Sequence, residues 1–262
     1  MKGKVKILNL GFIFCLMPVM LCSDSVDELG VTSYKGIYGT LRVPDSTHEK
    51  TQIMLHGGFK YEIFDNSNLY FSYRVKMFWD ILEKSSPFYD INHNPELFWQ
   101  TTKKWLPFWK KHLTFTKVGY EHLSNGVDNT STGEHGMIKR SRSLNNINAE
   151  FDFTLDEHWK ISPKIYTLFS IKDNPDIRDY YGNADVRIQY KRYNFIYGAN
   201  IRGNPKTGKG RVLLDFSTPA TWPIKNSNMF YYAEYFNGYG ESLLDYDKHI
   251  ESFRIGMMLS RK

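Results

Sequence analysis

Cysteine is nearly absent from the sequence. Its two cysteines, Cys15 and Cys22, both lie within the first 22 residues, so the rest of the chain cannot form a disulfide. Beyond residue 21 there is also no run near the roughly 20 apolar residues that a membrane-spanning helix needs. The chain also has no large excess of one charge, because 34 Lys and Arg are nearly balanced by 28 Asp and Glu. The formal net charge of +6 is too small to argue for a nucleic-acid partner.

The N-terminus carries a pattern typical of export. Lys2, Lys4 and Lys6 precede an apolar run from Ile7 to Leu21. A charged segment followed by a short apolar one is the layout of a secretory signal peptide. We therefore expect residues 1–23 to be a signal peptide, with cleavage near Ser23, and residues 24–262 to form a single domain.

Aromatic residues are abundant. The chain has 18 Tyr, 18 Phe and 6 Trp, more than one soluble core usually needs. Amphipathic rings gather in the interfacial belts of membrane β-barrels, which would account for the excess. An aromatic-rich soluble β protein is the alternative.

Apolar and polar residues alternate through most of the chain, as expected for strands with one apolar face. Ile53 and Leu55, for example, oppose Gln52 and His56. The pattern predicts twelve strands, at about 36–43, 52–64, 68–79, 95–106, 113–125, 141–153, 159–171, 183–190, 193–202, 210–218, 229–238 and 249–259.

The connections between these strands alternate in length. One set is generally long, at 80–94, 126–140, 172–182, 203–209 and 239–248. The other is mostly short, at 65–67, 107–112, 154–158 and 191–192, with 219–228 as the exception. Long outer loops, tight periplasmic turns and an even strand number are typical of outer membrane barrels. The sequence thus predicts an all-β, antiparallel transmembrane β-barrel of about twelve strands, whereas a soluble β-sandwich would share the alternation but not the loop asymmetry.

One group of polar residues falls on a predicted apolar face. Tyr120, His122 and Ser124 are spaced two apart, so they project from one side of a strand. A histidine beside a hydroxyl is the minimum that a nucleophile and its base require, although such pairs are common by chance. If the next strand forms a hairpin with this one, Asn145 lies near His122, on the face of Ile147 that would meet lipid.

The sequence around these residues resembles that of the outer membrane phospholipase A family. The strongest matches are Gly119-Tyr120-x-His122-x-Ser124-Asn125-Gly126 and Ser141-Arg142-Ser143-Leu144-Asn145. Further matches follow in order, at 85–88, 94–98, 173–177 and 237–246. The resemblance covers the chain from about residue 52 to its end.

The resemblance implies a calcium-dependent, dimeric barrel that hydrolyses acyl esters of glycerophospholipids, with its site at the outer leaflet of the bacterial outer membrane. Ser124 would be the nucleophile, His122 its base and Asn145 the residue that orients the imidazole. The Gly126 backbone N–H would stabilise the oxyanion together with Ca²⁺. The choice between the sn-1 and sn-2 esters stays open.

The calcium ligands implied by the resemblance are all oxygens. They are the Ser141 hydroxyl, the Val127 carbonyl and the carbonyl of Ser85 of the partner subunit. Such oxygen ligands suit a hard cation. Asp173 and Asp176 could support a second calcium ion, with a turn around Pro175 as the equally weighted alternative.

A further reading competes with this one. The barrel could be a pore or an adhesin whose His122 and Ser124 are catalytically idle. The segment 203–209 imitates a phosphate-binding loop, but Gly210 stands where that motif needs Ser or Thr, so a hairpin turn is favoured. The other histidines lack metal-ligand spacing and are expected in loops or in the lumen: His48, His56, His93, His112, His135, His158 and His249.

Overall fold

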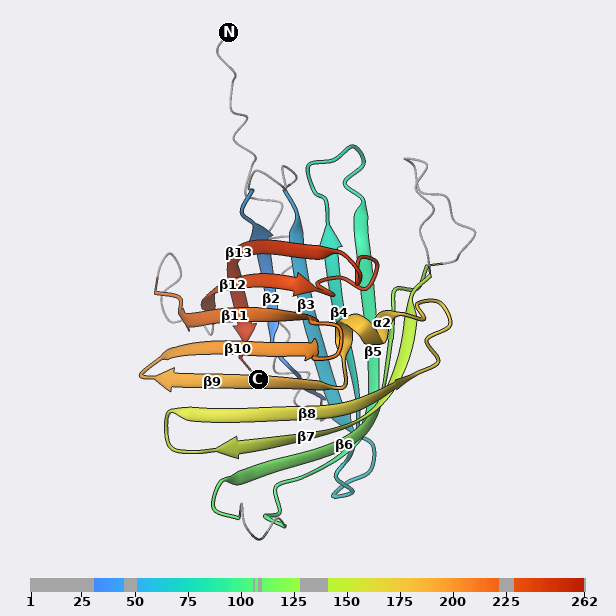
Figure 1. Cartoon of the computed structure of the whole chain (residues 1–262). Helices are drawn as coiled ribbons and strands as arrows, with labels where there is room; N and C mark the ends of the chain where they lie inside the picture. The colour runs from blue at the N-terminus through green and yellow to red at the C-terminus, as the bar shows by residue number, and fades with distance from the viewer. Residues whose placement is uncertain are drawn as a thin grey trace.

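The structure is a computed structural model that describes residues 31–44, 51–105, 107, 110–127, 141–221 and 229–261. Within these ranges the chain is antiparallel sheet with one short helix, α2 (Ile177–Tyr181) (Figure 1). The expected signal peptide, residues 1–23, lies outside the described residues. No helix in the described part is long and apolar enough to cross a lipid bilayer.

The strands follow the chain in order around the barrel. Their bounds are β1 (Val31–Ser33), β2 (Ile37–Arg42), β3 (Ile53–Glu62), β4 (Leu69–Trp79), β5 (Phe88–Thr101), β6 (Leu113–Ser124), β7 (Ser143–Thr154), β8 (Trp159–Phe169), β9 (Ala184–Arg192), β10 (Phe195–Asn204), β11 (Lys209–Pro219), β12 (Phe230–Tyr239) and β13 (His249–Ser260).

The sheet closes on itself. Each strand from β3 to β13 pairs with the next, and β13 pairs with β2, which pairs with β3. The short β1 does not add a thirteenth strand to the barrel wall. It pairs with β3 at Val31↔Tyr61, on the same strand that β2 pairs with at Tyr38↔His56. The prediction of an all-β, closed antiparallel barrel of twelve strands is therefore confirmed.

The predicted bounds of β5 were wrong. The sequence pattern placed this strand at 95–106, whereas it runs from Phe88 to Thr101. Asn92, Asn94 and Pro95 resemble a turn in the sequence, yet the two asparagines point into the polar lumen and are only 6% and 7% exposed. The outer connection before β5 is correspondingly shorter than expected.

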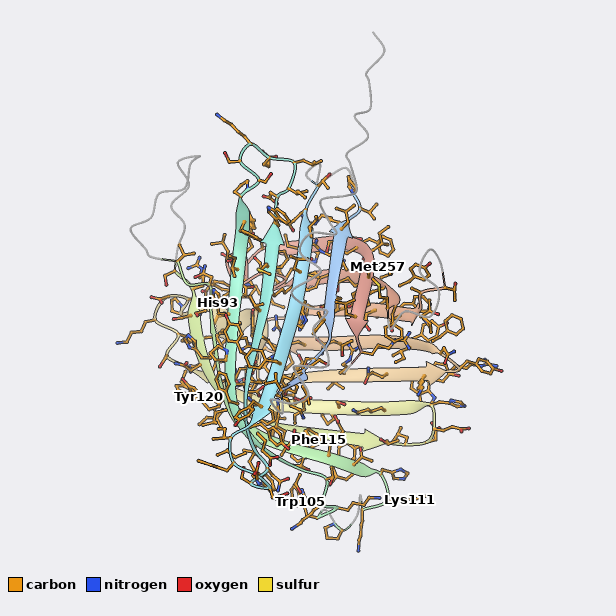
Figure 2. All side chains as sticks on the ribbon, turned by 180° about the vertical axis from the view of Figure 1, so that it is seen from behind. His93, Trp105, Lys111, Phe115, Tyr120 and Met257 are labelled. Atoms are coloured by element: carbon orange, nitrogen blue, oxygen red, sulfur yellow. The ribbon has the colours of Figure 1, made fainter. Side chains whose placement is uncertain are left out.

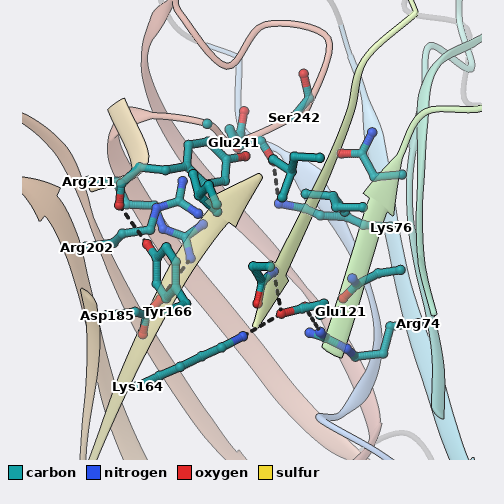
Figure 3. A pocket seen from close by; sticks show the side chains of 18 of the residues that line it. Arg74, Lys76, Glu121, Lys164, Tyr166, Asp185, Arg202, Arg211, Glu241 and Ser242 are labelled. Carbon is teal, nitrogen blue, oxygen red and sulfur yellow. Dashed lines mark hydrogen bonds and ion pairs between the residues drawn. The ribbon is translucent and has the colours of Figure 1, made fainter. Parts of the chain in front are cut away.

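The two faces of the wall have opposite chemistry. Outward side chains are apolar and exposed, such as Ile147 at 54% and Ile165 at 56%. The lumen holds ion pairs instead, for example Lys117 with Glu96 at 2.7 Å. A cavity of about 230 Å³ remains among charged side chains in the lumen (Figure 3). This alternation, polar inside and apolar outside, is the arrangement of a membrane barrel.

Aromatic side chains on the outer surface gather near the short turns. Trp159 contacts Tyr190 with ring centroids 4.7 Å apart, and Tyr190 contacts Tyr197. Phe216 in turn packs against Tyr197 and Phe195. This row has the composition of an interfacial aromatic girdle.

An apolar cluster lies at the opposite end of the barrel. It joins α2 to the loop between β12 and β13 and consists of Leu144, Leu168, Ile177, Tyr181, Leu243 and Tyr246. Leu144 lies on β7 with its side chain inward, directly behind the neighbouring Asn145. The cluster therefore supports the wall that carries the predicted site.

A buried carboxylate holds the same loop to the barrel. Glu241 accepts hydrogen bonds from Arg42, Ser252 and Arg254. Burial by itself would raise the pKa of Glu241, but Arg254, Lys76 and Arg42 lower it to about 2. The ionised carboxylate thus ties the loop to β2 and β13 at ordinary pH.

Candidate active site

His122 and Asn145 are direct neighbours across β6 and β7. His122 Nδ1 lies 2.7 Å from Asn145 Oδ1, and both side chains are on the outward face. An amide oxygen can only accept a hydrogen bond, so Nδ1 donates. The neutral ring then carries no proton on Nε2, which leaves this atom able to act as a base.

Ser124 is brought to this pair by its place on β6. It lies two residues beyond His122 on the same face, at a rise of roughly 3.4 Å per residue. Its Cα partner on β7 is Ser143, and this is the last pair in the register of the two strands. The three residues singled out in the sequence therefore gather on the outer wall at one end of the barrel.

Tyr120 is a further member of the group. Its hydroxyl donates a hydrogen bond to Asn145 Oδ1 at 2.8 Å. The amide oxygen therefore receives two hydrogen bonds, one from Tyr120 and one from His122. The sequence placed Tyr120 on this face through its spacing, but gave no indication of this contact.

The backbone at His122 is supported by Asn94. Pro95 would stand opposite His122, but proline has no N–H to donate to the ladder. The described pairing of β5 with β6 passes from His93↔Ser124 to Glu96↔Glu121. Asn94 Nδ2 instead donates to the His122 carbonyl oxygen at 2.7 Å. A side-chain amide thus replaces the missing backbone donor beside the predicted base.

The two stems of the 126–140 loop are joined directly after β6. Asn125 N donates to Arg142 O at 3.1 Å, and Arg142 N donates to Asn125 Oδ1 at 2.9 Å. Asn125 is buried at 3% exposure. Gly126 follows with φ +64°, a left-handed conformation that favours glycine. The joined stems fix where the chain turns next to Ser124.

The residues expected to bind calcium lie around this loop and in the turn before β5. Val127 and Ser141 lie on the two joined stems, so a backbone carbonyl stands on one side of the loop and a hydroxyl on the other. Ser85 is exposed in the turn between β4 and β5. The described part contains no cluster of three His, Cys, Asp or Glu, but the expected ligands are not of those types. This oxygen donor set fits a hard cation.

Asp173 and Asp176 have separate partners. Ser143 Oγ donates to Asp173 Oδ2 at 3.0 Å, whereas the Tyr246 hydroxyl donates to Asp176 Oδ1. Burial, together with the hydrogen bond to Asp176, raises the pKa of Tyr246. The two carboxylates thus attach the loop after β8 to β7 and to the apolar cluster, which agrees with the turn interpretation of this segment.

His93 lies on the outer wall beside Ser124. Its Cα partner across β5 and β6 is Ser124, and its Nδ1 is 2.5 Å from the Tyr73 hydroxyl. Figure 2 shows His93 and Tyr120 on the same wall, with Trp105 and Lys111 towards the other end. The expectation that His93 belongs to a loop or to the lumen was wrong, because β5 begins earlier than predicted.

Comparisons with known proteins agree with this picture. A family model described as phospholipase A1 matches residues 15–259. The phospholipase A1 of Klebsiella pneumoniae and that of Escherichia coli K12 are each 32% identical over 200 residues, covering 75% and 74% of this chain. The solved outer membrane phospholipase A of Escherichia coli superposes with a TM-score of 0.75 at 25% identity, covering 88% of this chain and 91% of that one.

A second solved structure is similar to the same degree. The outer membrane phospholipase dimer of Salmonella typhi, with bound calcium, gives a TM-score of 0.74 at 25% identity, over 88% of this chain and 92% of that one. The chain spans 64% and 63% of the length of the two curated enzymes named above. With the family model matching nearly the whole chain, and a barrel of the same architecture, the protein belongs to the phospholipase A1 family of outer membrane phospholipases.

Proposed function

We propose that this protein is an outer membrane phospholipase that hydrolyses acyl esters of glycerophospholipids with Ser124, His122 and Asn145. The observation that carries the proposal is the hydrogen bond of 2.7 Å between His122 and Asn145 on the lipid-facing wall, next to a serine. Polar groups facing hydrocarbon cost free energy, so a purely structural role would not favour them there. A site on this face meets its substrate in the membrane itself.

In the proposed reaction, Ser124 Oγ attacks the ester carbonyl carbon and His122 Nε2 takes its proton. The carbonyl electrons move onto oxygen, and the tetrahedral intermediate then collapses as His122 returns the proton to the leaving alcohol. Water then attacks the acyl-enzyme in the same way, with His122 as the base, and the fatty acid leaves as the proton returns to Ser124. Asn145 holds the ring with Nε2 unprotonated, while the Gly126 N–H donates to the oxyanion.

Calcium would be held by the Ser141 hydroxyl, the Val127 carbonyl and the carbonyl of Ser85 of the partner subunit. When bound, the ion supplies positive charge close to the developing oxyanion. Asn145 is uncharged, so it stabilises an imidazolium less than a carboxylate would, and a cation nearby offsets part of that deficit. The donor chemistry at the joined stems supports this assignment.

The active form is proposed to be a homodimer in the bacterial outer membrane. Around the site the wall is open rather than concave, since Tyr120, Leu97 and Phe71 are 43%, 44% and 38% exposed. A second barrel packed against this wall would cover an acyl chain and bring Ser85 of the partner subunit. Residues 1–23 would direct export, and the site would lie level with the outer leaflet.

The passive-pore alternative has less support. Many charged side chains of the lumen are ion-paired, such as Lys117 with Glu96 and Arg254 with Glu241, and Arg254 and Lys117 are fully buried. The apolar cluster of α2 and the β12–β13 loop occupies one end. An open aqueous channel would require both the lumenal charged side chains and this apolar cluster to move aside.

The direct test is fatty acid release from phospholipid micelles by the refolded full chain in the presence of Ca²⁺. Wild-type protein should release fatty acid, and Ser124→Ala should not. Asn148→Ala on the lumenal face of β7 is the matched control and should retain activity. Absence of release from a correctly folded wild-type barrel, across several phospholipid headgroups, would reject the proposal.

A further inference from the structure

His93 occupies a position that neither the family match nor the triad explains. It is on β5, and its backbone is paired with that of Ser124 on β6. Both side chains project outward, so the imidazole stands beside the nucleophile on the side away from Asn145. Two histidines therefore flank Ser124: His122 along its own strand and His93 across the neighbouring one.

The edge of the His93 ring that carries Nε2 faces Gly126. A Cβ built at position 126 would lie 3.4 Å from His93 Cδ2 and 3.5 Å from His93 Nε2. Gly126 is the residue whose N–H is proposed to donate to the oxyanion. His93 Nε2 thus lies within contact distance of the space beside Gly126, two residues beyond Ser124.

Tyr73 hydrogen-bonds one of the two ring nitrogens of His93. Its hydroxyl lies 2.5 Å from Nδ1. We assign the hydroxyl as the donor to Nδ1, since a phenol donates more readily than it accepts, and the proton of the neutral ring then resides on Nε2. Among the residues that the structure describes, none hydrogen-bonds Nε2. This N–H is available to a group bound between His93, Gly126 and Ser124.

We propose that His93 is a second oxyanion donor, whose Nε2–H hydrogen-bonds the carbonyl oxygen of the scissile ester as Ser124 attacks. The inference rests on the function proposed above. As the bond from Ser124 Oγ to the carbonyl carbon forms, the π electrons move onto oxygen and the serine proton passes to His122. His93 keeps its own proton, so its contribution is a fixed dipole directed at the charge that develops.

The test compares His93→Phe with His93→Gln in the refolded, calcium-loaded protein. Phenylalanine keeps an aromatic ring but has no donor, whereas the amide nitrogen of glutamine can occupy the place of Nε2. We expect kcat to fall on the order of 10²-fold in His93→Phe, as for other lost oxyanion donors, with KM nearly unchanged. His93→Gln should recover at least about a tenth of the wild-type kcat. His158→Phe, at an exposed turn, is the control and should match wild type.

A second measurement separates a direct from a structural role. Alkylation of His122 by iodoacetamide, located by mass spectrometry, forms no oxyanion and should proceed at the wild-type rate in both variants. If His93→Phe retains full kcat while Ser124→Ala is inactive, the His93 assignment is wrong and the proposed function stands. Equal loss in both variants, together with altered His122 alkylation, would also overturn it. A wild-type barrel without activity would instead defeat the proposed function.

Discussion

The Tyr120 hydroxyl and the His122 ring donate to the same atom, Asn145 Oδ1, at 2.8 and 2.7 Å. Tyr120 therefore fixes the amide with its oxygen towards His122 and its NH₂ group away. A flipped amide would present its NH₂ group instead, so that Nδ1 would have to accept and the ring proton would move to Nε2, the atom that must act as the base. The orientation of the His122 ring thus depends on Tyr120, two residues away on the same face of β6.

Tyr120→Phe should consequently lower kcat without abolishing it. The loss of one neutral hydrogen bond, worth about 0.5–1.5 kcal/mol, corresponds to roughly a 2- to 10-fold effect. Steady-state hydrolysis of a soluble ester measures it. Tyr235→Phe, which removes an outward hydroxyl bonded to Glu251 on the far strands, is the matched control. A Tyr120→Phe rate as low as that of His122→Ala would contradict the supporting role.

Ile147→Arg should destabilise the folded barrel in a bilayer. This side chain is 54% exposed on the outer wall, where a charge near the membrane midplane costs about 2–4 kcal/mol. Urea unfolding in lipid vesicles, followed by tryptophan fluorescence, gives the free energy of unfolding. Ile147→Leu and the lumenal Lys164→Arg should both stay within about 1 kcal/mol of wild type. Equal stability of Ile147→Arg and wild type would refute a lipid-facing wall.

Glu241 predicts a specific dependence of stability on pH. Its pKa is about 2 in the folded protein and 4.5 for a free side chain. Because the folded value is depressed, its contribution is complete above about pH 4.5 and is lost as the pH falls towards 2. Glu241→Gln should remove this dependence, of order 1–3 kcal/mol. Glu157→Gln, at a solvent-exposed turn, should leave the profile unchanged, and a Glu241→Gln profile parallel to wild type would count against the assignment.

Calcium and dimerisation should rise together. Crosslinking and hydrolysis are expected to increase over the same Ca²⁺ range, since a ligand that binds the dimer better shifts the population towards it. Ser141→Ala should move both curves to higher calcium, whereas Ser67→Ala, in a turn at the opposite end, should move neither. Full turnover by a monomeric preparation in excess chelator would refute the shared calcium site while leaving the triad intact.

Most of the fold was predictable because alternation with a period of two is a direct consequence of a wall with one lipid face. The hairpin that pairs His122 with Asn145 followed from the same pattern. The start of β5 was not predictable, because lumenal Asn92 and Asn94 beside Pro95 have the composition of a turn. That error also hid His93, whose partner Ser124 becomes visible only through the register of β5 and β6.

The apolar cluster at one end of the barrel was also missed. It joins Leu144 on β7 to Leu243 in a loop almost a hundred residues later. Contacts between distant loops leave no periodic trace in a single sequence. Likewise the donation from Asn94 to the His122 carbonyl depends on a proline opposite His122, which only the strand register reveals.

The central claim is that Ser124 carries the acyl group during hydrolysis, and trapping that intermediate tests it most directly. The refolded protein is mixed with a phospholipid bearing an isotopically labelled acyl chain, quenched in acid, digested and analysed by mass spectrometry. The account predicts the labelled acyl ester on Ser124 in wild type, no label in Ser124→Ala or His122→Ala, and a reduced amount in Asn145→Ala. Undiminished fatty acid release by Ser124→Ala, or an acyl label on a residue other than Ser124, would contradict it.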